Sequence, residues 1–253
     1  MSEGRISTEV TDGIGWLVLD NPQRRNAMDL AMYRAVPAAV DQLVDTEVAV
    51  IIVRGAGTEA FGAGSDISQF TRERTGPAAR HYNDVEHRAQ AALRAVDVPV
   101  IAMIHGPCMG GGIGMAAAAD LRYASEDAVF AVPPARLGVG YDPRAVTTLV
   151  ETVGPTAARE LLLTARRFDA AEALRLGFVN AVVAGPELEA HVVDVATGIT
   201  RLAPLTLSAL KRASYEGTTA ATVAATDRCY ASADYLEGIA AFTEKRPPVF
   251  RGH

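Results

Sequence analysis

The hydrophobic positions of this chain change their spacing from one segment to the next, and the spacing predicts the elements. Apolar residues alternate over Ile14–Leu19, which predicts a strand, and the continuous apolar runs Val48–Val53 and Val98–Ile104 are typical of buried strands. Helical spacing lies between them, and Asp29 is placed to cap a helix that continues to Val44. Pro37 must lie in the first turns of this helix or kink it. A second helix is predicted over Ala79–Val96, so the strand-helix-strand order indicates an α/β fold.

The second half of the chain turns from mixed to predominantly helical patterning. After Gly110–Gly112, small residues over Ile113–Ala119 predict a short buried helix. Short strands are predicted at Arg122–Ser125, Val129–Val132 and Phe178–Val183. Further helices are predicted over Thr156–Thr164, Asp169–Leu176, Glu187–Leu202, Pro204–Ser214, Thr219–Ala233 and Tyr235–Lys245. Asp169 is the expected N-cap and Gly177 the expected stop of the second of these helices. No linker rich in Pro, Ser or Gly separates the helical end from the rest.

Composition and charge limit the function classes. The 253 residues are 49% hydrophobic and 21% charged, as in an ordinary globular protein. The formal net charge of −6 gives no positive field for nucleic acid or an anionic membrane. The start of the chain has no leader pattern and the apolar runs are short, so a cytoplasmic protein is expected. Cys108, Cys229 and the histidines lack metal-ligand spacing, so no metal is expected.

Two glycine-rich corners carry the clearest chemical signal. They are Phe61-Gly-Ala-Gly-Ser-Asp-Ile67 and His105-Gly-Pro-Cys-Met-Gly-Gly-Gly-Ile-Gly114. Glycine lets the backbone approach a ligand, and backbone N–H groups stabilise a developing oxyanion by about 3 kcal/mol for each donor. The alternative is that these glycines only permit tight turns. Both corners resemble the crotonase (enoyl-CoA hydratase/isomerase) superfamily, and the resemblance continues at Asn21-Pro22, Phe168–Gly177 and Glu237–Phe250.

The resemblance implies a crotonase-type spiral of ββα units with a C-terminal helical subdomain. Residues 1–200 would form the spiral core and residues 201–253 a helical trimerisation region of the same continuous unit, giving a homotrimer or dimer of trimers. The implied substrate is a coenzyme A (CoA) thioester, with no permanently bound cofactor. The N–H groups of Ser65 and Gly111 are the implied oxyanion donors. The implied CoA contacts are Arg25, Ala27, Ala63, Asp66, Ile67, Phe242 and Lys245, the last two on a helix that often belongs to a neighbouring subunit.

The basic residues near the implied CoA site have an alternative explanation. Arg24, Arg25 and Lys245 are explained equally well as solvated surface charges that bind no ligand. An anionic cofactor portion would nevertheless account for basic groups at such points in an acidic protein. The sequence leaves both explanations open.

Two positions distinguish the chain from the hydratases that it resembles. Where those enzymes carry glutamates, this chain has Gly114 and Pro134, and neither residue can move a proton. Ordinary hydratase activity is therefore expected to be absent or very weak. The loop that contains Tyr141 resembles that of methylmalonyl-CoA decarboxylases, which need no general base because loss of carbon dioxide generates the enolate. The bacterial decarboxylases differ at Ser65, where the corner instead resembles eukaryotic ethylmalonyl-CoA decarboxylases.

Asp142 supports a competing prediction. It falls where dienoyl-CoA isomerases carry a catalytic aspartate and where 4-chlorobenzoyl-CoA dehalogenase carries its nucleophile, so it is a candidate proton carrier or nucleophile. The alternative is an Asp-Pro turn in which Asp142 caps a helix that opens near Arg144. Tyr141 has a matching alternative as a packed aromatic at the pocket rim.

Three functional hypotheses follow. The first is a carboxy-lyase that decarboxylates a short malonyl-type CoA ester, with Tyr141 orienting the departing carboxylate or helping to protonate the enolate. Absence of nearby carboxylates would favour such an anionic substrate. The second is an isomerase or hydrolase that uses Asp142. The third is a non-catalytic acyl-CoA-binding paralogue that keeps the pocket.

Overall fold

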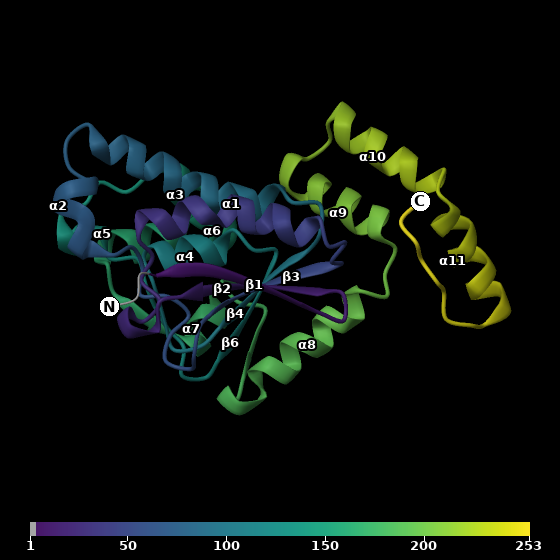
Figure 1. Cartoon of the computed structure of the whole chain (residues 1–253), viewed down its shortest axis with the longest axis horizontal. Helices are drawn as coiled ribbons and strands as arrows, with labels where there is room; N and C mark the ends of the chain where they lie inside the picture. Colours follow the sequence, from purple (N-terminus) through teal and green to yellow (C-terminus); the bar gives the residue numbers. More distant parts are fainter. Residues whose placement is uncertain (1–3) are drawn as a thin grey trace.

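Two sheets form the framework of the chain (Figure 1). In the computed structural model, which describes residues 4–253, the larger sheet has the strand order β1-β2-β3-β4-β6-β9 and the smaller one β5-β7-β8. Only β1 and β2 pair antiparallel in the larger sheet, and only β7 and β8 in the smaller one. The strands are β1 (Arg5–Thr11), β2 (Ile14–Asp20), β3 (Val50–Gly55), β4 (Val100–Ile104), β5 (Pro107–Met109), β6 (Leu121–Ser125), β7 (Val129–Ala131), β8 (Arg167–Asp169) and β9 (Ala181–Val183).

The helices connect these strands and then continue alone to the C-terminus. They are α1 (Leu30–Val44), α2 (Phe70–Glu73), α3 (Ala78–Ala95), α4 (Gly111–Ala117), α5 (Pro134–Leu137), α6 (Pro143–Thr164), α7 (Ala170–Arg175), α8 (Leu188–Ile199), α9 (Pro204–Glu216), α10 (Ala220–Tyr230) and α11 (Ala233–Glu244). Short 3₁₀ turns lie at Pro22–Arg24, Ile67–Gln69 and Gly185–Glu187.

The chain alternates between the two sheets and builds a spiral. After β4 in the larger sheet it enters β5 in the smaller one and then α4; after β6 and β7 it enters α5 and α6. This is the ββα order expected from the sequence. The α/β fold class is therefore confirmed.

The apolar run of β3 is buried on both faces of the larger sheet. Ile51 and Val53 pack in the cluster that includes residues of α1 and α3. Val50 and Ile52 belong to a second cluster with residues of α8 on the opposite face. All four side chains are fully buried, and burying each contributes roughly 1.5–3 kcal/mol. The helices thus cover both faces of the central strands, which explains the continuous apolar pattern.

Most predicted elements occur, with shifted bounds. Asp29 caps α1 by accepting a hydrogen bond from the Met32 N–H at 2.8 Å, and Asp169 caps α7 in the same way. Gly177 has the positive φ expected of a helix stop, 75°. Pro37 lies well inside α1, not in its first turns. The sequence prediction missed β1, β5 and β8; β5 and β8 are only three residues each, and β1 lies at the sheet edge with mostly polar residues.

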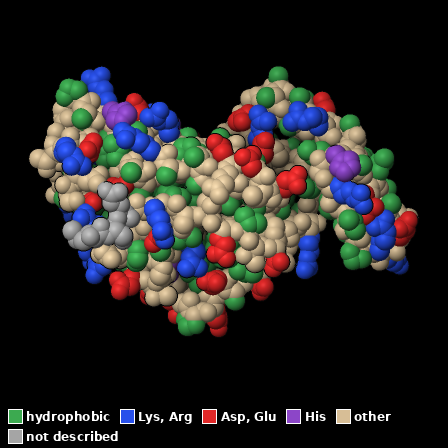
Figure 2. Space-filling model, in the orientation of Figure 1, with side chains coloured by type: hydrophobic (Ala, Val, Ile, Leu, Met, Phe, Trp, Pro, Cys, Tyr) green, Lys and Arg blue, Asp and Glu red, His purple; other side chains and the backbone are tan. Residues whose placement is uncertain are grey.

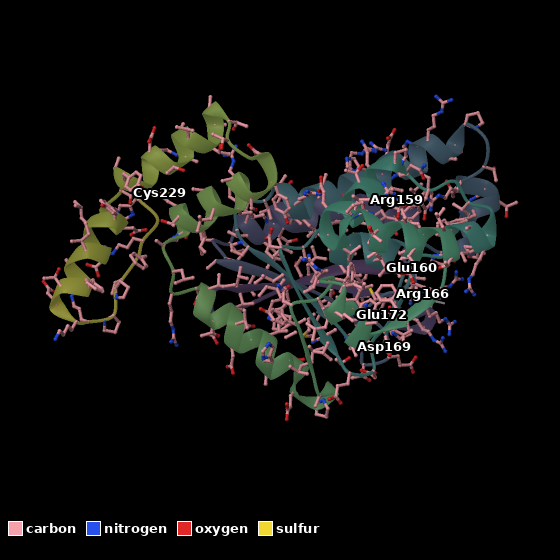
Figure 3. All side chains as sticks on the ribbon, turned by 180° about the vertical axis from the view of Figure 1, so that it is seen from behind. Arg159, Glu160, Arg166, Asp169, Glu172 and Cys229 are labelled. Atoms are coloured by element: carbon pink, nitrogen blue, oxygen red, sulfur yellow. The ribbon has the colours of Figure 1, made fainter. Side chains whose placement is uncertain are left out.

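The helix predicted at Thr156–Thr164 is longer than expected. It is the second half of α6, and Gly154 interrupts α6 with φ 77° and ψ 161°, where only glycine is unstrained. Beyond α6, Arg166 contacts Glu160 at 2.8 Å and Glu172 at 2.7 Å, which links the end of α6 to α7 (Figure 3). These are surface ion pairs on the back of the spiral.

The C-terminal helices leave much apolar surface exposed. In Figure 1, α10 and α11 extend away from the sheets, at the end opposite α2 and α5. Phe242 is 86% exposed on α11, and Leu236 on the same helix is 67% exposed. A groove of about 690 Å³ runs between these helices, lined by side chains such as Leu210, Tyr230 and Ile239. The boundary between residues 200 and 201 falls between α8 and α9.

Charge is spread evenly over the surface that faces the viewer in Figure 2. Lys and Arg side chains alternate there with Asp and Glu side chains, and no extended basic area appears on that face. Over residues 4–253, none of the helices is both long enough and apolar enough to cross a membrane.

Candidate functional site

The first glycine corner packs against the turn that precedes α1. The Met28 N–H donates to the Gly64 carbonyl at 2.8 Å, and the Asp66 N–H donates to the Met28 carbonyl at 2.8 Å. The Ala63 N–H donates to the Arg25 carbonyl at 2.9 Å. Two segments far apart in the sequence are thereby held side by side.

The second corner is joined to the first by backbone hydrogen bonds. The Gly62 N–H donates to the Pro107 carbonyl at 3.1 Å, and the Met109 N–H donates to the Gly62 carbonyl at 2.9 Å. Gly64 has φ 99°, and a Cβ there would lie 2.9 Å from the Met109 carbonyl oxygen. Any larger residue would separate the corners, which explains the need for glycine at this position.

The two corners line one narrow cavity, and each contains an N–H group without a protein acceptor among the described residues. Ser65 and Gly111, the first residue of α4, line a cavity of about 70 Å³ together with Gly64 and Gly110. Within residues 4–253, neither the Ser65 N–H nor the Gly111 N–H donates to a protein acceptor. Two such donors are able to bind an oxygen that gains negative charge.

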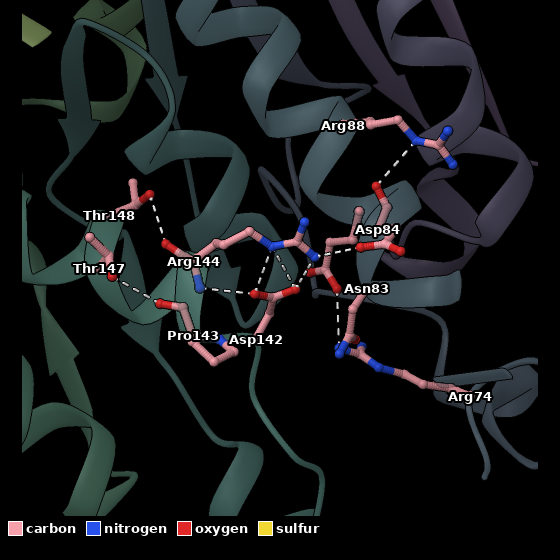
Figure 4. Close-up of polar contacts among 10 residues, drawn as sticks. Arg74, Asn83, Asp84, Arg88, Asp142, Pro143, Arg144, Thr147 and Thr148 are labelled. Atoms are coloured by element: carbon pink, nitrogen blue, oxygen red, sulfur yellow. Dashed lines mark hydrogen bonds and ion pairs between the residues drawn. The ribbon is translucent and has the colours of Figure 1, made fainter. Parts of the chain in front are cut away.

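Polar side chains from other elements enter the same cavity. Glu86 of α3, Arg74 directly after α2, and Tyr141 directly before α6 all line it. The Arg74 Nη2 lies 3.2 Å from the Glu86 Oε2, and the two side chains are only 7% and 9% exposed. Arg74 also donates to Asn83 Oδ1 at 2.9 Å (Figure 4). The cavity therefore contains a buried ion pair that no sequence motif indicated.

Burial decides the protonation of these groups. It raises the pKa of Glu86 above the ordinary 4.5, although the Arg74 charge opposes the shift. Burial also raises the pKa of Tyr141, and it raises that of Tyr82, a neighbour of this site, to about 12. The phenols stay neutral at physiological pH, whereas the carboxyl group of Glu86 is shifted towards that range.

Glycines in α4 allow α3 to come close enough for Glu86 to reach the corner. A Cβ on Gly111 would lie 3.2 Å from the Glu86 Oε1 and 2.1 Å from the Tyr33 Oη. A Cβ on Gly114 would lie 2.4 Å from the Gln90 Nε2. Gln90 of α3 therefore occupies the space in which a longer side chain at position 114 would begin.

Asp142 does not line the cavity between the two corners. Its Oδ1 accepts from the Arg144 N–H at 2.9 Å, which caps α6, and its two oxygens accept from the Arg144 guanidinium at 2.6–3.2 Å (Figure 4). Arg144 also contacts Asp84 at 2.7 Å. These hydrogen bonds hold the pKa of Asp142 below its usual value. Asp142 lines a second, smaller cavity together with Tyr141, Glu86 and Gln90. Because its Oδ1 accepts from the Arg144 N–H at the start of α6, its predicted capping role is confirmed.

Most of the expected CoA contacts lie around the first corner. Ala63 is joined to Arg25 by the hydrogen bond described above, and Ala27 directly precedes Met28, which contacts the corner. Ile67 is exposed beside the narrow cavity. Asp66 accepts from the Ser68 N–H at 3.0 Å and pairs with Arg24, at the edge of a larger cavity of about 530 Å³. Ligand-sized space therefore adjoins the corner.

Phe242 and Lys245 do not join this group within one chain. Phe242 is on α11 and Lys245 directly follows it, at the end of the molecule opposite α2 and α5 (Figure 1). In the part of the chain from residue 4 onwards, no cluster of three His, Cys, Asp or Glu side chains has the geometry to hold a metal ion.

The sequence prediction missed Arg74, Glu86 and Gln90. A signal was present for two of them, because Tyr82, Glu86 and Gln90 recur every four residues on the buried face of α3. Polar residues at buried helix positions mark a place where something other than core packing is selected. Arg74 has no comparable signal, since it lies in the irregular segment between α2 and α3.

Comparisons with known proteins show what the chain as a whole resembles. The enoyl-CoA hydratase/isomerase family model matches residues 9–253. Probable enoyl-CoA hydratase 2 of Arabidopsis thaliana is 32% identical over 95% of this chain and 82% of its own length. Carnitinyl-CoA dehydratase of Salmonella typhi is 34% identical over 93% of this chain and 94% of its own. The crystal structure of an enoyl-CoA hydratase/carnithine racemase from Magnetospirillum magneticum superposes with a TM-score of 0.95 at 34% identity, covering 100% of this chain and 97% of that one.

Proposed function

The chain belongs to the enoyl-CoA hydratase/isomerase family and has the crotonase fold, and from this premise we propose that it stabilises the enolate of a bound CoA thioester. The thioester oxygen would accept hydrogen bonds from the Ser65 and Gly111 N–H groups. The supporting observation is that Ser65 and Gly111 both line one narrow cavity and that, within residues 4–253, neither N–H donates to a protein acceptor. Such preorganised donors act on charge as it develops, without reorganisation.

Decarboxylation of a short malonyl-type CoA ester remains the first candidate reaction. The bond to the carboxylate breaks, its electron pair forms the enolate, carbon dioxide leaves, and the α-carbon then takes a proton. Gly114 and Pro134 carry no charge, so neither position repels the carboxylate of the substrate. Tyr141 lines the cavity. The expected absence of nearby carboxylates is wrong, because Glu86 lines the cavity. Its buried partner Arg74 carries the opposite charge and offsets the repulsion of an anionic substrate.

A double-bond shift in an unsaturated thioester is the second candidate. It requires one group to remove a proton and return it, and Glu86 is a carboxyl group that lines the cavity. The corresponding isomerase or hydrolase mechanism with Asp142 would require its carboxylate to leave Arg144. Hydration and dehydration, which the names of the relatives indicate for them, need an acid and a base at the same bond.

The remaining parts of the chain would serve substrate binding and assembly. We place CoA along Arg25, Ala27, Ala63, Asp66 and Ile67, and residues 201–253 in the contacts of a homotrimer or dimer of trimers. The exposed apolar side chains of α9–α11 support this assignment, since patches of this kind mark interfaces. In the assembly, Phe242 and Lys245 would approach the CoA of a neighbouring subunit. Light scattering tests the assembly, and a monomer at micromolar concentration would contradict it.

The enolate proposal is tested by comparing two substitutions of Gly111 that add a similar volume but differ in whether the backbone N–H is present. A Cβ at position 111 meets the Tyr33 Oη at 2.1 Å, so the comparison is made in a Tyr33→Phe background. Gly111→Ala keeps the N–H, whereas Gly111→Pro removes it and is compatible with the first position of a helix. The measured quantity is incorporation of deuterium at the α-carbon of butyryl-CoA in heavy water.

We expect the proline variant to exchange about 100-fold more slowly than the alanine variant, since one lost donor costs about 3 kcal/mol. Both variants should bind butyryl-CoA. Equal rates in the two variants would contradict the proposed role of Gly111. Binding without any exchange or turnover in the wild type would leave the non-catalytic paralogue as the function.

A further inference from the structure

Glu86 lies in the cavity that the two enolate donors share, on a helix that supplies neither donor. We propose that Glu86 is the acid and base that moves the proton at the α-carbon of the bound acyl group. The inference rests on the proposed enolate chemistry and adds a catalytic residue to it. It applies to both candidate reactions, since one needs a proton delivered and the other needs it removed and returned.

The position of Glu86 is set by the packing of α3 against α4. Its Oε1 lies 3.2 Å from where a Cβ of Gly111 would be, so the carboxyl group stands beside the residue whose N–H binds the thioester oxygen. Gln90, one turn further along α3, fills the space above Gly114. The carboxyl function therefore reaches the substrate from α3, and the side chain that could have carried it on α4 has been reduced to a hydrogen atom.

No other group that lines the cavity fits the role as well. Glu86 is the one carboxyl group among the described residues of its lining, which also includes the Tyr141 phenol, the Ser65 hydroxyl and the Arg74 guanidinium. The pKa of Tyr141 is raised by burial, which makes it a weak acid. Asp142 is fixed by Arg144 and lies in the second cavity.

The groups that face Glu86 permit both of its protonation states. Arg74 lies directly against it and favours the carboxylate, whereas burial and the charge of Asp142 favour the acid. Tyr33 from α1, Tyr82 from α3 itself and Tyr141 also surround it, and all three stay neutral. A carboxyl group with a raised pKa is a stronger base when ionised, and it remains a much stronger acid than the neighbouring phenols when neutral.

The proposed step conserves atoms and charge. The ionised Glu86 takes the α-proton, the C–H electron pair becomes the double bond of the enolate, and the thioester oxygen becomes negative against Ser65 and Gly111. Arg74 keeps its charge throughout. In reverse, the neutral Glu86 returns a proton to the α-carbon. In heavy water the carboxyl group exchanges with solvent between the two steps, so deuterium enters the substrate.

Deuterium incorporation into butyryl-CoA, followed by mass spectrometry, tests this inference without assuming a natural substrate. We expect Glu86→Gln to slow the exchange by about 10²- to 10⁴-fold, the usual contribution of a general acid–base group, while butyryl-CoA still binds. Glu160→Gln is the matched control, because it neutralises a surface carboxylate on α6 that does not line the cavity and should exchange at a rate close to the wild type. Asp142→Asn tests the other carboxyl group near the site. Circular dichroism verifies that each variant folds.

Chemical rescue separates proton transfer from a structural role. Glu86→Ala leaves a cavity beside Arg74, and added formate should restore part of the exchange there, which a purely structural loss would not allow. Wild-type exchange that persists in Glu86→Gln, or fails only in Asp142→Asn, would overturn the inference and leave the enolate proposal standing. Absence of exchange in the wild type would overturn the inference about Glu86, and absence of both exchange and turnover would overturn the enolate proposal as well.

Discussion

Glu86 and Asp142 both line the second, smaller cavity, and their surroundings shift their pKa values in opposite directions. Asp142, at the start of α6, has its oxygens engaged by the Arg144 backbone and guanidinium, and its pKa is lowered. Glu86, on the inner face of α3, has one buried partner, Arg74, and its pKa is raised. The difference teaches that the chemistry of a carboxyl group follows from its desolvation and hydrogen bonds.

The two regions also differ in the kind of contact that stabilises them, local at Asp142 and tertiary at Glu86. The Asp142 region is local and partly open, since Arg144 is two residues away and its side chain is 43% exposed. The Glu86 region depends on tertiary packing, because α2, α3 and α4 must all be in place before Arg74 and Glu86 meet. Substitutions in the two regions should therefore differ in cost.

The largest effect is expected from Arg74→Met, which leaves Glu86 without its partner. Met keeps apolar contact with the rings of Phe70 and Tyr82, over which the guanidinium now lies at 5.1 and 4.5 Å. Breaking a buried pair costs about 3–5 kcal/mol, so the free energy of unfolding at neutral pH should fall by that amount. Urea denaturation measures it.

The pH dependence of this variant provides the check. Without Arg74 the pKa of Glu86 rises further, so the loss of stability should grow as pH increases from below 4.5 through the pKa of the folded state. Adding Glu86→Gln should recover much of the loss, since it removes the unpaired charge. A loss that is independent of pH and of Glu86 would show that the pair is not the cause.

An intermediate effect is expected from placing a glutamate on α4. Gly114→Glu puts a Cβ 2.4 Å from the Gln90 Nε2, and overpacking of this kind typically costs about 1–3 kcal/mol. Gln90→Ala should relieve most of the cost in the double variant. Thermal unfolding compares Gly114→Glu, Gln90→Ala and the double variant. If Gly114→Glu destabilises the protein equally with and without the Gln90 side chain, Gln90 does not fill the space that a side chain at position 114 would need.

The smallest effect is expected from Asp142. Asp142→Ala removes the N-cap of α6 and should cost about 1 kcal/mol, whereas Asp142→Asn keeps an oxygen acceptor and should cost less. Because the pKa of Asp142 is lowered on folding, its ionic contribution is complete above 3.8 and is lost as pH falls through the folded-state pKa. Denaturation curves measured in acid test this pH dependence. A loss of unfolding free energy in Asp142→Ala that exceeds the loss in Arg74→Met would contradict the expected order of the two regions.

Local features of the site were predictable from the sequence. The apolar runs indicated β2, β3 and β4, and the corners around Ser65 and Gly111 were evident because a glycine requirement is a property of the backbone at that residue. The capping role of Asp142 was among the alternatives, since its acceptor bond spans only two residues.

The position of Glu86 was not predictable in the same way. It depends on how closely α3 approaches α4, and that distance is set by Gly111 and Gly114 on a different element. The periodic polar residues of α3 show only that one buried face is polar, without identifying the cavity it meets. The same limit applies to Arg74, which reaches the site from an irregular segment.

The most direct test of the central claim, that packing drives the pKa values of these two carboxyl groups apart, is an infrared titration. The C=O stretch of a protonated carboxylic acid is followed from acid to neutral pH in difference spectra of the wild type against Glu86→Gln and against Asp142→Asn. We predict that the band assigned to Glu86 keeps more than half of its intensity at pH 4.5, whereas the band assigned to Asp142 has lost more than half of its intensity at pH 3.8. A Glu86 band that disappears at or below that of Asp142 would contradict the account.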